Sequence, residues 1–327
     1  MDGVINVYKE KGYTSHDVVA KLRGILHQKK IGHTGTLDPN ATGVLPVCVG
    51  NATKLCDFLS DGTKEYEAVM LLGCTSDTYD ASGVMLTKAD DSEMEALSEP
   101  SVKSCILSFM PGYDQIPPMY SAKKVDGKKL YELAREGKEI DRKPVYVELS
   151  SIEIVDITLP RVTFKVTCSK GTYIRSLCHD IGAKLGCGAI MESLVRTRVS
   201  QFEIEDAMTI SEIEEIIKAT EDEDLTYFSG ENPIDTALNG IVIPTDMILE
   251  EYDALLTVKE ADNLLDNGNL FPQNLVNITY CNVFDESSEY AVSDGDIVRI
   301  YNSKEKFIGL YKYSKDEGMF RPYKMFT

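Results

Sequence analysis

The chain reads GHTGTLDPNATGVLP from Gly32 to Pro46. Gly35 and Gly43 permit unusual backbone angles near the two ends of this stretch, and Pro39 fixes the backbone just after Asp38. The many Gly, Thr, Asp and Pro residues predict a structured loop over residues 32–46. An isolated Asp-Pro pair is typical of an ordinary turn, but a loop stiffened in this way can hold one carboxylate in a fixed position. Asp38 is therefore the candidate catalytic residue.

The segments around the loop predict a mixture of strands and helices. Residues 65–74 are apolar enough for a largely buried strand. From Arg161 to Cys168, apolar and polar residues alternate, which predicts a half-buried antiparallel strand. A helix is predicted after Gly171, with Gly186 as its stop. Further helices are predicted from Ser15, as N-cap, to near Gln28, and over residues 130–137, 211–219 and 258–266.

The chain is predicted to divide near residue 245. Residues 222–245 form a polar, acidic connection without clear periodicity. Short strands follow, most clearly at residues 297–300 and 307–311, and these indicate a small β-rich domain. We therefore predict a large domain over residues 1–245 and a small domain over residues 246–327.

The composition is that of a folded protein without a membrane segment. Of the 327 residues, 43% are hydrophobic and 27% are charged, as in ordinary globular chains. No apolar run approaches the roughly 18 residues that span a bilayer, and the N-terminus lacks the pattern of a signal peptide. None of the eight cysteines is spaced as C-x-x-C, so we interpret them as buried apolar residues. These features predict a cytoplasmic protein without a bound metal.

The net charge of −19 argues at first sight against a nucleic-acid partner. The acidic residues are unevenly distributed, however. Residues 211–265 contain 2 Lys or Arg and 15 Asp or Glu, a net charge of −13, whereas residues 1–210 carry a net charge of only −4. A local basic surface is therefore compatible with the composition, and we predict that residues 211–265 lie away from it.

The Gly32–Pro46 stretch closely resembles the active-site motif of the TruB family of tRNA pseudouridine synthases. The similarity continues, in the order of the family's motifs, through Val47–Leu55, Lys64–Ala68, Ile116–Glu132 and Cys168–Leu177. The resemblance implies an α+β pseudouridine-synthase fold, with a mixed, largely antiparallel central sheet flanked by helices and a small β-rich PUA-like C-terminal domain. Two departures are Glu10, where the family has proline, and Val195, where it has arginine.

The activity implied by this resemblance is the isomerisation of uridine 55 to pseudouridine in the T-loop of tRNA. The N-glycosidic bond breaks, the uracil rotates, and a C–C bond forms between C5 and the ribose. No atom is gained or lost, so we expect no cofactor. Asp38 would attack the ribose or the pyrimidine, or remove a proton. The target base must first leave the RNA stack, which costs a few kcal/mol.

The resemblance also assigns further residues to the site. Arg175 would pair with Asp38 and oppose the rise in the pKa of Asp38 that burial causes; without that role it would be a charge on a helix surface. Tyr66 would offer a ring to the flipped base and a phenol near the C5 proton, unless it is a strand core residue. Substrate contacts are implied for His33, Lys54, Tyr173 and Leu194. Taken alone, Tyr173 would be a cap over a helix start and Leu194 a helix core residue.

Residues 111–144 resemble the family's RNA-gripping insertion. Their basic residues surround the turn signal Asp126-Gly127 and are Lys123, Lys124, Lys128 and Lys129. These lysines could hold phosphates, although the same run also fits a solvated hairpin. We expect tRNA, through its T-arm, as the partner and no obligatory protein partner.

Two alternative functions stay open. A guide-RNA-dependent pseudouridine synthase shares the Leu-Asp-Pro motif, but it acts on ribosomal RNA and needs partner proteins. The basic insertion favours the stand-alone tRNA enzyme. An RNA-folding chaperone with secondary catalysis would be favoured by a degenerate Asp38 or Arg175, and both residues are intact.

Overall fold

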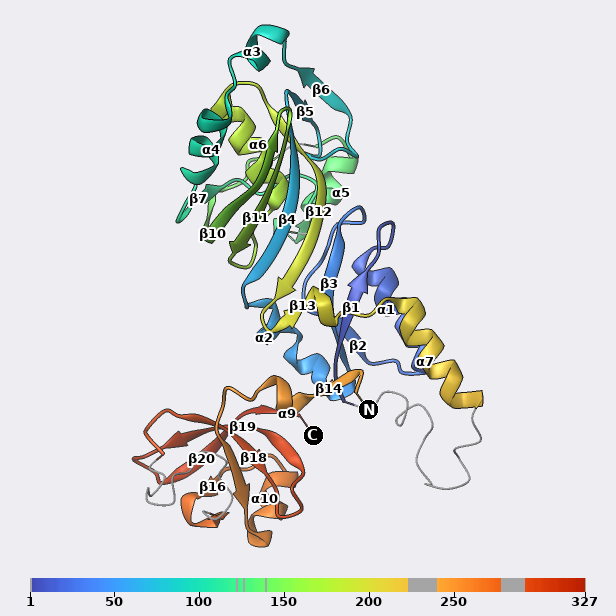
Figure 1. The fold of residues 1–327 in the computed structure, drawn as a ribbon. Helices are drawn as coiled ribbons and strands as arrows, with labels where there is room; N and C mark the ends of the chain where they lie inside the picture. Colours follow the sequence, from blue (N-terminus) through green and yellow to red (C-terminus); the bar gives the residue numbers. More distant parts are fainter. Residues whose placement is uncertain are drawn as a thin grey trace.

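A computed structural model describes residues 2–121, 123–125, 127–138, 140–222, 240–277 and 292–326. Two sheets organise these residues, a large one from the N-terminal part of the chain and a smaller one at the C-terminal end (Figure 1). Most of the predicted acidic connection, and Cys281, lie outside the described residues.

The large sheet has ten strands within the described ranges, in the order β14-β1-β3-β12-β4-β11-β10-β7, with β2 on β3 and β13 on β12. Strands β3 and β12 run parallel, and the other pairs are antiparallel. The strands are β1 (Gly3–Lys9), β2 (Ile31–His33), β3 (Thr42–Val49), β4 (Lys64–Leu72), β7 (Gly112–Gln115), β10 (Val145–Thr158), β11 (Arg161–Cys168), β12 (Ala189–Val199), β13 (Phe202–Glu203) and β14 (Val242–Pro244). This is the mixed, largely antiparallel sheet that was expected.

Helices cover the large sheet in two groups (Figure 1). Helices α4 and α6 pack on the half formed by β4, β10, β11 and β12, and α1 and α7 pack on the half formed by β1 and β3. The α-helices are α1 (Ser15–Ile25), α2 (Cys56–Ser60), α3 (Asp91–Glu95), α4 (Glu99–Leu107), α5 (Leu130–Arg135), α6 (Ile174–Leu185), α7 (Ile210–Asp222), α9 (Thr245–Ile248) and α10 (Asp262–Asp266). The 3-10 helices are η1 (Gly50–Leu55), η2 (Ile204–Asp206), η4 (Lys259–Ala261) and η5 (Gln273–Leu275). The parallel pair β3–β12 joins the two halves.

The alternating strand and the helix that follows it are as predicted. In β11, Val162, Phe164 and Val166 are fully buried, whereas the residues between them are partly exposed. Helix α6 ends before Gly186, whose φ of +84° is in the left-handed region that glycine adopts at little cost. Helix α7 likewise covers the predicted 211–219.

The first helix differs from its prediction at both ends. Thr14, and not Ser15, is the N-cap: its hydroxyl accepts the Asp17 N–H at 3.1 Å, and the Asp17 carboxylate accepts the Thr14 N–H at 2.8 Å. The helix ends at Ile25 instead of near Gln28. Ser15 is buried, and its hydroxyl accepts the Leu37 N–H at 2.9 Å. The residue predicted as a cap thus ties the helix to the Asp38 loop.

The loop predicted over residues 32–46 is shorter than expected. Gly32 and His33 belong to β2, and β3 begins at Thr42, so the loop spans only residues 34–41. Gly43 has a φ of +106°, and a Cβ added there would lie 2.2 Å from the carbonyl oxygen of Arg196. The close approach of β3 to β12 therefore requires this glycine within a strand, where a loop had been predicted.

Two predictions in the second half of the chain also need correction. Leu194 lies in β12, opposite Ala68 of β4, and not in a helix; the chain reverses after Gly186 and pairs along β4 instead of extending α6. The helix predicted over residues 258–266 begins as the 3-10 helix η4 and continues as α10.

The smaller sheet contains the described C-terminal strands in the order β16-β20-β19-β18-β15-β17. They are β15 (Ala254–Thr257), β16 (Phe271–Pro272), β17 (Val276–Asn277), β18 (Ile297–Tyr301), β19 (Phe307–Ser314) and β20 (Met319–Met325), so strands lie at both predicted positions. Leu310 and Phe326 share an apolar cluster with Val44 and Ile248, which joins this sheet to the large one. Two short hairpins complete the structure, β5 (Cys74–Ser76) with β6 (Met85–Lys88) and β8 (Lys124–Val125) with β9 (Lys128–Lys129). In the described part of the chain, no helix is long and apolar enough to cross a membrane.

Candidate active site

Asp38 lies in the loop between β2 and β3, close to where the two halves of the large sheet join. Leu37 and Ala41 of this loop are buried in the apolar core that α6 covers. The Ala41 N–H donates to the Asp38 carbonyl at 3.0 Å, and the Ser15 hydroxyl holds Leu37. Packing and hydrogen bonds on both sides of Asp38 therefore hold the backbone that carries its carboxylate.

Arg175 forms an ion pair with Asp38. Its Nε lies 2.8 Å from Oδ2 of Asp38, and its Nη2 donates to Oδ1 at 3.3 Å. Arg175 is the second residue of α6, and its side chain is only 5% exposed, so it is not the surface charge that a helix position alone would suggest. A guanidinium that contacts both oxygens fixes the orientation of a carboxylate. The structure thus brings together the two residues that were expected to pair.

The same guanidinium joins two other segments to the loop. Nη1 of Arg175 donates to the Thr78 carbonyl at 3.2 Å, and Nη2 donates to the Tyr120 carbonyl at 3.0 Å. Nη1 also lies 3.9 Å from Oδ2 of Asp80. Asp80 was not predicted as a site residue, because it lies in a polar turn and the sequence gives no signal of its proximity to Asp38.

The surroundings of Asp38 change its acidity in opposite directions. Burial raises the pKa of Asp38 above its usual value, and the nearby charge of Asp80 raises it further, whereas Arg175 and Lys9 lower it. About a third of the side chain, 35%, is still exposed. The carboxylate is therefore accessible to a substrate, although surrounding protein displaces water that would stabilise its charge.

Lys9 is a buried cation behind the loop that the sequence analysis did not identify. Its Nζ donates to the carbonyls of Tyr13 at 2.7 Å and Pro39 at 3.2 Å. Burial lowers the pKa of Lys9 to about 8, an effect that the charge of Asp38 opposes. The lysine thus holds the backbone directly after Asp38. The available signal was a basic residue at the end of an otherwise buried strand.

Arg196 is a second buried cation that was missed. It is 1% exposed in β12, and it donates to the carbonyls of Val44 at 2.7 Å and Gly35 at 3.3 Å. These contacts connect both ends of the Asp38 loop to β12. Its sequence neighbours Val195, Thr197 and Arg198 gave no signal that this arginine is buried.

Tyr66 lies in β4, opposite Arg196 of β12. It is 9% exposed and shares the apolar cluster of Leu37, Ala41 and Leu194. Burial raises the pKa of Tyr66, and the charge of Arg196 opposes that rise. Burial thus favours the protonated phenol, which can donate a hydrogen bond.

The other predicted substrate contacts lie on three separate elements. His33 is half-buried in β2, and its Nδ1 accepts the Gly35 N–H at 3.3 Å; burial lowers the pKa of His33. Tyr173 occupies the N-cap position of α6, but its side chain makes no capping hydrogen bond, and its backbone N–H donates to Gln115 at 2.8 Å. Lys54 is partly buried in η1.

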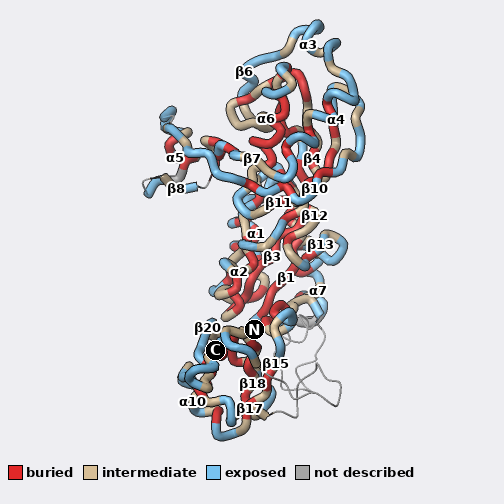
Figure 2. Tube along the Cα trace, turned by 90° about the vertical axis from the view of Figure 1, so that its left-hand side faces the viewer, coloured by how far each residue is buried: buried red, intermediate tan, exposed pale blue. Residues whose placement is uncertain are grey.

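The predicted RNA-gripping lysines lie on a small hairpin. Strand β7 pairs with β10, so the excursion from the sheet begins after Gln115 and not at residue 111. Lys124 pairs with Lys129 in the β8–β9 hairpin, and Lys123 and Lys128 are exposed. Figure 2 shows this hairpin and α5 projecting from one side of the large sheet, with α7 on the other side.

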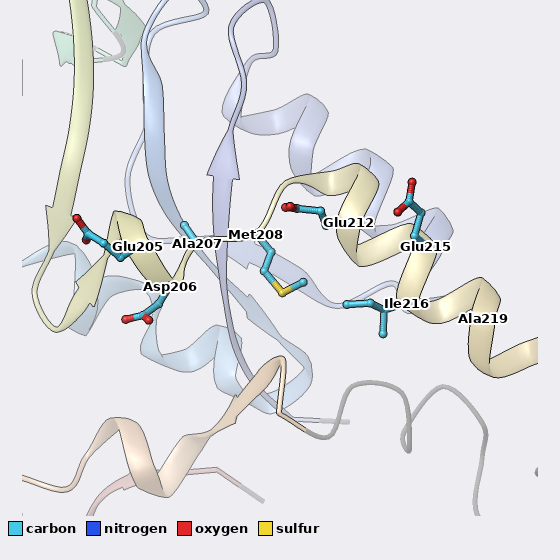
Figure 3. Close-up of a pocket in the computed structure, with 8 residues that line it drawn as sticks. All are labelled: Glu205, Asp206, Ala207, Met208, Glu212, Glu215, Ile216 and Ala219. Atoms are coloured by element: carbon cyan, nitrogen blue, oxygen red, sulfur yellow. The ribbon is translucent and has the colours of Figure 1, made fainter.

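A hollow of about 590 Å³ lies between η2 and α7. Its acidic lining residues, shown in Figure 3, are Glu205, Asp206, Glu212 and Glu215. We call it the acidic hollow. None of the candidate site residues lines it, and no Lys, Arg or His is among its lining residues. Glu212 and Glu215 belong to residues 211–265, where the negative charge is concentrated, whereas Glu205 and Asp206 precede that segment.

Comparisons with known sequences identify the family. A sequence model for the "TruB family pseudouridylate synthase (N terminal domain)" matches residues 23–174, and one for the "tRNA pseudouridylate synthase B C-terminal domain" matches residues 175–250. The chain is 46% identical to tRNA pseudouridine synthase B of Lachnoclostridium phytofermentans, with 100% of both chains covered. It is 42% identical to tRNA pseudouridine synthase B of Clostridium tetani, with 97% of both chains covered. The chain belongs to the TruB family of pseudouridylate synthases.

Solved structures agree with the TruB assignment. A chain in the crystal structure of a Cbf5-Nop10-Gar1 complex aligns with a TM-score of 0.68 and 26% identity, over 99% of this chain and 85% of that chain. A chain in the structure of an H/ACA RNP bound to a substrate RNA containing 2'-deoxyuridine aligns with a TM-score of 0.67 and 24% identity, over 99% and 85% of the two chains, which shows the shared fold. The expected family and the pseudouridine-synthase fold of this TruB enzyme are therefore confirmed.

Proposed function

We propose that this TruB-family enzyme converts uridine 55 in the T-loop of tRNA to pseudouridine, with Asp38 as its catalytic carboxylate. The observation that carries the proposal is the Asp38–Arg175 ion pair, formed within a loop whose backbone is held on both sides. The relatives that match over the full chain are tRNA pseudouridine synthases, which supports tRNA as the substrate class.

Asp38 must be an anion in this reaction, whether it attacks the ribose, attacks the pyrimidine or removes a proton. Burial opposes ionisation, and the positive charges of Arg175 and Lys9 favour it. Arg175 also fixes the direction of the carboxylate oxygens. The site therefore supplies one oriented and accessible carboxylate to a base that has left the RNA stack.

The isomerisation requires no net exchange of atoms with a cofactor. The bond from N1 to the ribose breaks, the new bond forms at C5, the C5 hydrogen leaves as a proton, and N1 takes up a proton. In the proposal, the protonated phenol of Tyr66 and the apolar side chain of Leu194 lie against the flipped uracil. His33, Lys54 and Tyr173 contact the surrounding nucleotides. The lysines of the β8–β9 hairpin hold phosphates of the T-arm. The proposal includes a cytoplasmic location, since that is where tRNA is used.

Loss of the C5 hydrogen gives a direct test. A T-arm stem-loop labelled with [5-³H]uridine should release tritium when the purified chain is added, and a stem-loop with cytidine at position 55 should release none from that position. Release from other uridines alone would overturn the assignment of position 55. Complete absence of release from both the stem-loop and whole tRNA would overturn the proposed activity.

The same assay separates the guide-RNA-dependent alternative. The structural similarity to a chain of a Cbf5-Nop10-Gar1 complex motivates this comparison. A guide-dependent enzyme would be inactive on a bare T-arm without partners, whereas the proposed enzyme is active alone. If the chain is instead a chaperone with secondary catalysis, the Asp38→Asn variant should accelerate tRNA folding as well as the wild-type chain does.

A further inference from the structure

A second hollow, of about 490 Å³, lies between α1, β2 and η1. Its basic lining residues are His16, Arg23, Lys29, Lys30 and His33. We call it the basic hollow. None of its ten lining residues is acidic. In a chain with a net charge of −19, a concave surface with this composition is a local reversal of charge.

The cationic side chains of the basic hollow are exposed, and only some of their N–H donors have hydrogen-bond partners within the protein. Arg23, Lys29 and Lys30 are exposed. Arg23 donates through Nη2 to the Ile31 carbonyl at 3.2 Å, and Lys30 donates to Oδ1 of Asn51 at 2.8 Å. These two contacts position the side chains without neutralising them. A guanidinium has five N–H donors and an ammonium has three, so further donors are available to a ligand.

The carboxylate nearest in sequence to these cations has another role. Asp17 follows His16, but its carboxylate accepts hydrogen bonds from the backbone N–H and the hydroxyl of Thr14 at 2.8 and 2.6 Å. It completes the cap of α1. Burial lowers the pKa of His33, so the positive charge of the hollow at neutral pH comes chiefly from Arg23, Lys29 and Lys30.

The walls of the basic hollow are directly connected to the Asp38 loop. His33 leads from β2 into the loop, and its ring accepts the Gly35 N–H. On the opposite wall, Ser15 precedes His16 and bonds to Leu37. Both walls are therefore one hydrogen bond away from the loop that carries Asp38.

We propose that the basic hollow binds backbone phosphates of the same tRNA whose uridine reaches Asp38, as a second grip besides the lysine hairpin. Exposed lysine and arginine side chains around a concavity suit phosphate oxygens, and the repeating charge of an RNA backbone can occupy several of them at once. The inference rests on the proposed function for the identity of the RNA.

The test is the salt dependence of binding to a whole, unmodified tRNA transcript. The variant Lys29→Gln/Lys30→Gln removes two positive charges from the hollow and leaves Arg23 in place. Its Kd should rise about fivefold or more at 0.1 M salt. The slope of log Kd against log salt should decrease by about 1 to 2 units. The KM for tRNA should rise by the same factor as the Kd.

A matched control removes the same charge elsewhere. Lys103→Gln/Lys218→Gln changes two exposed lysines, on α4 and α7, and should keep the wild-type Kd and slope. A raised Kd with an unchanged slope in the hollow variant would indicate a structural defect and would overturn the phosphate contact, as would binding equal to that of the control. Lys29→Glu alone, at an exposed position, should weaken binding in the same direction and guards against misfolding of the double variant.

Failure of this inference is distinguishable from failure of the proposed function. If the wild-type chain releases tritium from the T-arm and the hollow variant binds tRNA as the control does, the basic hollow does not bind RNA. If the wild-type chain releases none and the salt slope of the hollow variant is still reduced, the activity is wrong and the phosphate-binding role of the hollow stands.

Discussion

Carboxylates occur in two contrasting settings in this molecule. In the Asp38 loop, one carboxylate is paired with Arg175 and lies near Lys9. In the acidic hollow, the carboxylates of four residues line one concavity of about 590 Å³ without a cation among them (Figure 3). The volume of the acidic hollow exceeds that of the basic hollow beside the Asp38 loop, which is about 490 Å³.

The contrast shows that gathering carboxylates in a hollow does not by itself orient them or pair them with a cation. A carboxylate can act as a nucleophile or base when it is oriented, partly desolvated and kept ionised. In the structure Arg175 orients Asp38 and burial partly desolvates it; burial raises the pKa of Asp38, and the charges of Arg175 and Lys9 oppose that rise. In the acidic hollow, Glu212 accepts the Thr209 N–H and hydroxyl at the start of α7, which is a structural role.

The largest effect is expected for Asp38→Asn. The amide has the same shape but cannot act as an anion, so tritium release should fall by about 10⁴-fold or more, while the circular dichroism spectrum remains that of the wild type. Near-normal turnover in this variant would show that Asp38 is not the catalytic carboxylate.

Arg175→Lys should lower kcat by about 10²-fold. The ammonium keeps the charge but cannot contact both oxygens of Asp38 and the carbonyls of Thr78 and Tyr120 in one plane. The Kd for the T-arm should stay within about twofold of the wild type, because the hydrogen bonds that this change removes are within the protein. An unchanged kcat would show that the orientation of Asp38 does not depend on this ion pair.

The pH dependence of activity tests the raised pKa of Asp38. Because the folded pKa of Asp38 is raised and the anion is the active form, activity is full above that pKa and is lost as the pH falls through it. The acid limb of kcat/KM should therefore lie above the ordinary aspartate value of about 3.9, with a tenfold loss per pH unit below it. A limb at or below that value, measured while circular dichroism shows the folded state, would contradict the raised pKa.

Charge reversal on the hairpin tests where the RNA binds. Changing Lys123, Lys124, Lys128 and Lys129 to Glu should raise the Kd for tRNA about tenfold at 0.1 M salt. The log–log salt slope should decrease by up to about 1 unit for each phosphate that the hairpin no longer neutralises. Retention of the wild-type slope would mean that the hairpin does not grip RNA.

The smallest effect is expected in the acidic hollow. Glu205→Gln, Asp206→Asn and Glu215→Gln together remove three negative charges. Charges more than about 8 Å from the RNA are largely screened at physiological salt, so Kd and kcat should change by less than about twofold. A large gain in tRNA affinity would show that the acidic hollow lies close to the bound RNA, contrary to the prediction.

Local sequence patterns predicted several of the elements and the candidate catalytic residue. Alternation over Arg161–Cys168 predicted β11, and Gly186 marked the end of α6, because strand and helix periodicity and left-handed caps are local properties. The similarity of the Gly32–Pro46 stretch to a family motif identified Asp38 as a candidate and predicted its pairing with Arg175.

The packing of the elements sets which distant side chains surround that residue. Arg175 is 137 positions from Asp38, and Arg196 is 161 positions from Gly35. Asp80 and Ser15 have polar sequence surroundings that fit ordinary turns and caps. Asp80 lies near Arg175 of α6, and Ser15 of α1 accepts the Leu37 N–H of the Asp38 loop, so these contacts arise from how the elements pack together. A local pattern encodes the period of an element, whereas the packing of elements against one another decides the partners of its side chains.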